Sequence, residues 1–169
     1  TAHIGVRAGL TGVTVLSTLH ANDSASVIDV FREFDVPPMF IGNSLQGIIS
    51  QRLIRKVCPK CKTAYQPEPA AIEFLGIESG GPTSVEVFRG EGCDACFQTG
   101  YRGRTGVFET MAVKGEVSDA ILRDKRSDHL TEIAVANGMQ TLEQSARNKV
   151  LSGITTLEEM HYILTSYTK

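Results

Sequence analysis

Four cysteines, arranged as two Cys-x-x-Cys pairs, constrain the fold of this chain more than any other feature of its sequence. The first pair is Cys58 and Cys61, and the second is Cys93 and Cys96. A gap of two residues lets both thiolates of a turn point at one ion, and two such turns complete a tetrahedral shell of four sulfurs that suits Zn²⁺. We therefore expect a structural zinc site with no open coordination position.

The long separation of the two pairs leaves other interpretations open. Residues 62–92 lie between them, a longer stretch than the roughly 15–20 residues common in zinc ribbons. The insertion is expected to hold a short helix near residues 70–75 and a strand near residues 85–89. Disulfides would require an oxidising compartment, and a thioredoxin-like redox motif needs one such pair rather than two. These two readings, and free thiols, remain alternatives to zinc.

Hydrophobic patterning predicts a mixed α/β chain. Residues 13–17 are β-branched and apolar and are expected to form a buried strand between helices over residues 2–10 and 25–34. Asp23 or Ser24 is expected to cap the second of these helices. Further helices are predicted over residues 39–47, 117–126, 129–137, 142–152 and 157–167, and further strands over residues 50–57 and 104–113.

Local signals add detail to this outline. Three pairs fit the capping-box pattern at helix starts: Thr141 with Gln144, Thr155 with Glu158, and Thr156 with Glu159. Glycines flank the second cysteine pair, as a backbone that wraps closely round a metal would require: Gly90, Gly92, Gly100, Gly103 and Gly106. Residues 77–84 are rich in glycine and serine and are predicted to be mobile.

His20 is the candidate functional residue outside the cysteines. It follows the predicted strand and precedes a predicted helix N-terminus, where α/β folds place ligands because helix N–H groups favour anions. A histidine at such a junction can hydrogen-bond a phosphate oxygen or a water molecule. A lone loop histidine is more often an ordinary surface or core residue, so the local sequence leaves its role open.

Charge and hydropathy exclude some classes of function. Five basic residues cluster beside the first cysteine pair: Arg52, Arg55, Lys56, Lys60 and Lys62. The chain as a whole carries a formal net charge of −2, which argues against a dominant nucleic-acid surface. No apolar run approaches the roughly 18 residues that span a bilayer, so we expect neither direct nucleic-acid binding nor a transmembrane segment.

The sequence also lacks a phosphate-binding loop. No Gly-x-x-x-x-Gly-Lys-[Ser/Thr] segment is present, so this polypeptide by itself is not expected to hydrolyse nucleotide. The chain begins with Thr1, inside a predicted helix, rather than with methionine. Both features predict a fragment of a longer protein.

Several segments match one known family in their order along nearly the whole chain. They are residues 10–12, residues 16–23 around His20, residues 44–55, the two cysteine pairs, residues 100–109 and residues 153–159. Together they resemble the ATPases of type II secretion and type IV pilus assembly. The resemblance implies the C-terminal part of a RecA-like P-loop ATPase core, with an inserted four-cysteine zinc subdomain and a C-terminal helical bundle.

The resemblance also implies an organisation and a partner set. Residues 1–57 would be the C-terminal portion of the ATPase core, residues 58–105 the zinc subdomain, and residues 106–169 a C-terminal strand and helical subdomain. The complete protein would be a cytoplasmic homo-hexamer, peripheral at the inner membrane, that contacts platform proteins of the machine. It would use ATP and Mg²⁺ to power pilus assembly or secretion.

Four residues acquire roles from the matched motifs alone. His20 corresponds to the histidine of the family's histidine box, near the nucleotide phosphates, and Thr18 would help fix that loop. Gln51 and Arg52 fall in a matched segment and are expected to support the nucleotide site. The competing hypothesis is a non-catalytic, zinc-dependent module that binds nucleic acid or protein, since a basic segment lies beside a cysteine turn.

Overall fold

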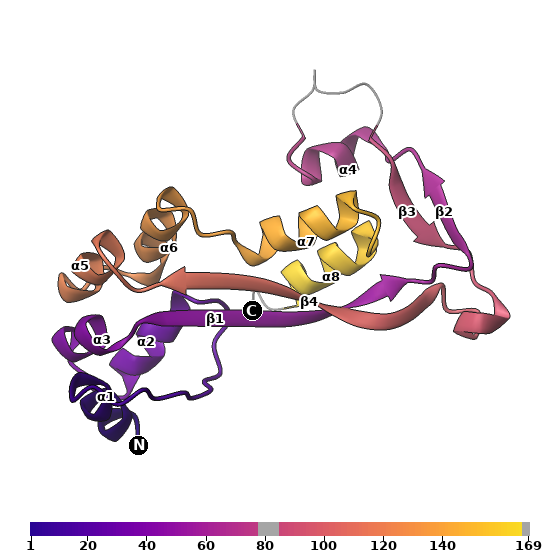
Figure 1. Ribbon diagram of the computed structural model, residues 1–169. Helices are drawn as coiled ribbons and strands as arrows, with labels where there is room; N and C mark the ends of the chain where they lie inside the picture. Colours follow the sequence, from indigo (N-terminus) through magenta and orange to yellow (C-terminus); the bar gives the residue numbers. More distant parts are fainter. Residues whose placement is uncertain (78–84, 167–169) are drawn as a thin grey trace. The chain divides into compact units, whose positions relative to one another are not determined.

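A computed structural model describes residues 1–77 and 85–166 of the 169-residue chain (Figure 1). Its helices and small sheets confirm the mixed α/β class. The chain divides into two compact units, and each unit is built from two separate stretches of sequence. Unit 1 comprises residues 1–50 and 108–141, and unit 2 comprises residues 51–107 and 142–169. Most of the predicted mobile stretch, residues 78–84, and the predicted end of the last helix at residue 167 lie outside the described residues.

Unit 1 is mainly helical. Its helices are α1 (Ala2–Leu10), α2 (Ser26–Glu33), α3 (Pro38–Ser44), α5 (Glu116–Leu122) and α6 (Ser127–Ala136). α1 has the bounds predicted from the sequence, and α3 begins at Pro38, a residue favoured at the first helical position because its ring presets φ. The unit closes over a core in which Ile28, Ile41, Met111 and Leu130 are fully buried.

The strand predicted over residues 13–17 does not form in this structure. These residues carry no regular secondary structure, and their apolar side chains lie at the surface, with Leu16 at 94% exposure. A strand is stabilised by backbone hydrogen bonds to a neighbouring strand. In the described part of the chain the sheets contain β1 paired with β4 and β2 paired with β3, so residues 13–17 have no strand beside them.

Two pairs of strands form the sheets. β1 (Gly47–Val57) pairs with β4 (Tyr101–Ala112), and β2 (Lys62–Tyr65) pairs with β3 (Val87–Gly90). The second pair is antiparallel, with Lys62 opposite Gly90 and Tyr65 opposite Val87. The sequence predicted β1, β3 and β4 within a few residues of their observed bounds. It missed β2, whose four residues carry no alternating pattern and are ordered by pairing with β3.

Unit 2 places helices beside these strands. They are α4 (Pro69–Phe74), α7 (Leu142–Leu151) and α8 (Leu157–Thr165). Ile54, Val107, Val150 and Met160 form the centre of its buried core. The predicted cap of α8 is confirmed, because the Thr156 hydroxyl accepts the N–H of the residue three positions later at 3.3 Å. Within the described ranges no helix has both the length and the hydropathy needed to cross a membrane.

Candidate functional site

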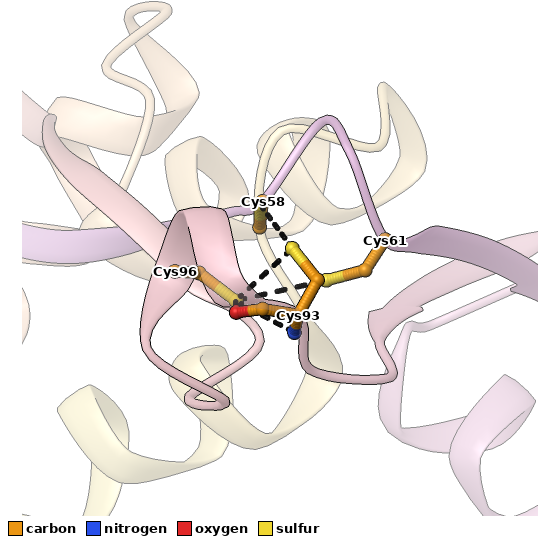
Figure 2. A group of neighbouring side chains, drawn as sticks. All are labelled: Cys58, Cys61, Cys93 and Cys96. Atoms are coloured by element: carbon orange, nitrogen blue, oxygen red, sulfur yellow. Dashed lines mark hydrogen bonds between the residues drawn. The ribbon is translucent and has the colours of Figure 1, made fainter.

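The strand pairing of unit 2 brings the two cysteine turns together. Cys58 directly follows β1, and Cys61 directly precedes β2. Cys93 and Cys96 flank the short turn between β3 and β4. Since the first residue of β2 lies opposite the last residue of β3, both turns leave the same end of this two-stranded sheet. Pairing of β2 with β3 therefore brings the two ends of the long insertion together. The four cysteine side chains point toward one another (Figure 2).

The spacing of the four sulfurs fits a tetrahedral metal ion. The Sγ atoms of Cys58 and Cys93 are 3.9 Å apart, those of Cys61 and Cys96 are 3.8 Å apart, and those of Cys93 and Cys96 are 3.7 Å apart. All four lie within 4.8 Å of one another. Sulfurs bound to Zn²⁺ at about 2.3 Å in a tetrahedron would be roughly 3.8 Å apart. A disulfide needs about 2.05 Å, so the cysteines are unpaired here and disulfides are excluded in this structure.

Backbone N–H groups around the cluster favour thiolates. The N–H groups of Cys93 and Gly100 both donate to the Sγ of Cys96 at 3.3 Å. Burial opposes ionisation of Cys96, but these two bonds and the neighbouring thiols outweigh it and lower its pKa to about 6. Burial, reinforced by the other three thiols, raises the pKa of Cys61 to about 12. Four thiols this close cannot all ionise unless a cation balances their charge, so the donor set fits a divalent ion.

Two glycines let the turns approach. A Cβ at Gly90 would overlap the carbonyl group of Gly100, and a Cβ at Gly100 would lie against the carbonyl oxygen of Gly90. The same Gly100 carbonyl accepts the N–H of Cys58 at 2.8 Å, so it links the first turn to the second. Glycine is required at these two positions because the two backbones touch and leave no room for a Cβ atom, and not only because of the backbone conformation.

Gly90→Ala should weaken metal binding about 10- to 100-fold. The new methyl group would push away the Gly100 backbone, which holds Cys58 through its carbonyl and Cys96 through its N–H, and groups that orient ligands typically contribute this much affinity. Competition with a chelator would measure the change. Gly5→Ala is a matched control, because its Cβ would meet only an ordinary contact with Val15 at 3.8 Å. Equal affinities for the two variants would contradict this role for Gly90.

Thr18 and His20 lie on an exposed segment of unit 1. Residues 11–20 are all exposed. The segment is attached at its start, where the N–H of Val13 donates to the carbonyl of Ala8 in α1 at 3.1 Å. At its end the Asp23 carboxylate accepts the N–H of Ser26, the first residue of α2, at 2.7 Å. The N-cap residue of α2 is Ala25, which makes no side-chain cap bond, so neither Asp23 nor Ser24 occupies the predicted cap position, although Asp23 bonds the first helical N–H.

Ser24 is instead buried and bonded to a distant strand, a contact that sequence reasoning missed. Its N–H donates to the carboxylate of Glu109 at 2.8 Å, and its hydroxyl donates to the Glu109 carbonyl at 3.3 Å. Ser24 is fully buried, and Glu109, on β4, is 5% exposed. The two residues are 85 positions apart, so the pairing leaves no local signal in the sequence. The one available clue was that Glu109 alternates with the apolar residues Val107 and Met111 on one face of the predicted strand.

Gln51 and Arg52 belong to unit 2, whereas Thr18 and His20 belong to unit 1. Gln51 is exposed on β1, and the Arg52 side chain donates to the carbonyl of Gln51 at 3.3 Å. Two other members of the basic cluster are engaged within unit 2. Arg55 pairs with a buried glutamate, and the Lys62 ammonium lies 3.8 Å from the centre of the Phe88 ring.

Arg55 on β1 forms an ion pair with the buried Glu159 on α8. The Glu159 carboxylate accepts the Arg55 backbone N–H at 2.7 Å and the guanidinium at 2.6 and 2.8 Å. Glu159 is 5% exposed, and its bond with Arg55 raises the pKa of that arginine. The guanidinium also lies 4.0 Å from the centre of the Tyr101 ring. These contacts join β1 and β4 to α8, and the sequence identified Glu159 only as a capping residue.

Comparison with known proteins shows which protein family this chain belongs to. The family model described as "Type II/IV secretion system protein" matches residues 1–162, which is nearly the whole chain. The chain belongs to this family. The resemblance noted from the histidine segment, the cysteine pairs and the closing helices is therefore confirmed.

Relatives within the type II/IV secretion family are similar over most of this chain. The type IV pilus assembly ATPase PilB of Thermus thermophilus is 41% identical over 160 residues, which are 95% of this chain and 18% of that protein. The type II secretion system protein E of Pseudomonas aeruginosa is 36% identical over 95% of the chain and 31% of that protein. The type II secretion system ATPase E of Vibrio cholerae is 32% identical over the same two shares. The chain thus spans less than a third of the length of these relatives.

Proposed function

We propose that this chain is the C-terminal part of an ATPase that powers type IV pilus assembly or type II protein secretion. The observation that carries the proposal is the family match over residues 1–162, together with relatives named for these two activities. The phosphate-binding loop would lie in the longer protein, upstream of this sequence. The chain alone is expected to be inactive, because it contains no such loop.

In the proposed ATPase, unit 1 contributes to a RecA-like core. The exposed apolar residues Val13, Val15 and Leu16 support this. If the sheet of the core includes strands from another part of a longer chain, a segment with strand composition is expected to lie unpaired at the surface when that part is absent. We propose that residues 13–17 pair with that part. The segmentation into residues 1–57, 58–105 and 106–169, with a C-terminal helical bundle, belongs to the same proposal.

His20 is proposed to act beside the nucleotide. Its place on an exposed segment that is fixed at both ends suits a side chain that hydrogen-bonds a phosphate in one state of the cycle and releases it in another. Thr18 would help to hold the segment, and Gln51 and Arg52 would support the nucleotide site from β1. Bound Mg²⁺ would neutralise the phosphate charge that develops during hydrolysis.

The ion in the cysteine cluster is proposed to be a structural Zn²⁺. Four sulfur ligands close the tetrahedron and leave no position for a substrate. The ion would fix the relative positions of the turn after β1 and the turn before β4. The complete protein is further proposed to be a homo-hexamer at the cytoplasmic face of the inner membrane, where it contacts platform proteins of the machine.

His20→Ala in the complete protein should lower ATP turnover about 100- to 1,000-fold, as expected when a group that hydrogen-bonds the reacting phosphates is lost. The metal content should stay at one ion per chain. Steady-state hydrolysis assays and metal analysis of the same preparations would measure both.

His129→Ala is the matched control for this experiment. His129 is also an exposed histidine of unit 1, paired with Glu132 at 3.2 Å on α6, and its loss should leave turnover unchanged. Normal turnover in His20→Ala would remove His20 from the mechanism. An upstream coding sequence without Gly-x-x-x-x-Gly-Lys-[Ser/Thr] would remove the ATPase proposal itself.

A further inference from the structure

A buried carboxylate holds the end of the segment that carries His20. The Ser24 N–H donates to Glu109 at 2.8 Å, and both residues are buried among the apolar side chains of unit 1. A carboxylate is costly to bury unless it makes strong hydrogen bonds, so its presence in this core needs a polar partner. The backbone of Ser24 is such a partner, and a bond to an ionised acceptor is about twice as strong as a neutral one.

The anchor lies close to His20 along the chain. His20 and Ser24 are four positions apart, and a fully extended chain spans at most about 3.6 Å per residue, so the His20 backbone stays within roughly 14 Å of Ser24. Residues 11–20 are exposed, whereas Ser24 is fully buried. The Glu109 bond therefore fixes the point at which the exposed segment re-enters the core.

We propose that Glu109 is a positioning residue for the histidine segment. By holding the N–H of Ser24 on β4, it sets where residues 18–23 lie and so where His20 meets a bound phosphate. The proposal rests on the role given to His20 above. An error of about 1 Å in the position of a reacting group can cost about 100-fold in rate, so a support of this kind has a measurable effect.

Two substitutions separate the parts played by the acceptor and its charge. Glu109→Gln keeps an oxygen that can accept the Ser24 N–H but removes the charge, and we expect turnover to fall about two- to five-fold. Glu109→Leu removes the acceptor and leaves that N–H buried without its partner, and we expect a fall in kcat of about 10-fold or more. KM for ATP should change less than kcat in both variants, because the segment is displaced while other nucleotide contacts remain.

The complete protein with its upstream region is the material for this test. ATP turnover would be measured for His20→Ala, Glu109→Leu and the double variant, with the melting temperature recorded for each. If Glu109 acts through His20, the double variant should be no slower than the slower single variant, because the two losses share one cause. A purely structural role would give additive losses and a fall in kcat that follows the loss of stability. Thr110→Gln, at the next and exposed position of β4, is the control.

The possible results distinguish the two proposals. Additive losses of turnover in the double variant, or normal turnover in Glu109→Leu, would overturn the positioning role of Glu109. If His20→Ala is slow in the same experiment, the ATPase assignment remains intact. Normal turnover in His20→Ala would overturn the role of His20 and with it the role of Glu109. Slow single variants with a non-additive double variant, and near-normal turnover in Thr110→Gln, would establish both.

Discussion

Cys96→Ser should release the bound metal and unfold the part of unit 2 that the two cysteine turns hold together. Cys96 is 3% exposed, and its sulfur accepts two backbone N–H groups in addition to facing three other sulfurs. Structural zinc sites contribute on the order of 10 kcal/mol to folding, which is comparable to the whole stability of a typical domain. We therefore expect a loss of this order, the largest effect among the changes considered.

Metal analysis and hydrogen exchange would measure this result. Wild-type chain should contain one ion, and Cys96→Ser less than a tenth of that, with faster exchange at residues 58–65 and 87–100. Phe97→Ser is a matched control, because Phe97 is the adjacent residue in the same turn and its side chain is 89% exposed. A metal-free Cys96→Ser chain with wild-type melting would show that the ion is not structural.

Arg55→Leu should destabilise unit 2 by about 3 kcal/mol. The substitution leaves the Glu159 carboxylate, whose side chain is 6% exposed, without the guanidinium that holds it at 2.6 Å. Breaking a buried ion pair by removing one partner typically costs about 3–5 kcal/mol. The lower end applies because the Arg55 side chain is 55% exposed, so solvent already screens part of its charge. Urea denaturation followed by a probe in unit 2 would give the change in free energy of unfolding.

A second ion pair of similar length provides the control. Arg89 and Glu91 are 2.8 Å apart, but both side chains are about half exposed, so Arg89→Leu should cost far less stability than Arg55→Leu. The double variant with leucine at both residue 55 and residue 159 should regain part of the lost stability, because it no longer buries a lone charge. If Arg55→Leu and Arg89→Leu cost the same, burial of the glutamate is not the source of the effect.

The features that sequence predicted well are those set by short stretches of chain. α1 has its predicted bounds because its apolar spacing lies within nine residues, and the cysteine turns were recognised because each pair spans only four residues. The cap of α8 by Thr156 depends on a bond to the residue three positions later and was also correct. These patterns depend on little besides their own neighbourhood.

The features that it missed depend on distant parts of the chain. Residues 13–17 have the composition of a strand, but a strand also needs a partner, and within the described residues there is none beside them. Glu159 matches a capping box, yet its carboxylate binds Arg55, 104 residues away. The bond between Ser24 and Glu109 spans 85 residues. Neither partner could be chosen from local pattern, because each bond joins residues that are far apart in the sequence.

The division of the chain has a consequence for its synthesis. Each unit is assembled from two stretches that alternate along the sequence, so neither can be completed in one continuous piece. All four cysteines leave the ribosome before residues 142–169, which supply α7 and α8 to unit 2. The 45 residues from 97 to 141 lie between them, so at about 5–20 residues per second this interval lasts roughly 2–9 s. The proposed ion would thus bind to the cysteine turns first, and the later helices would then dock on them.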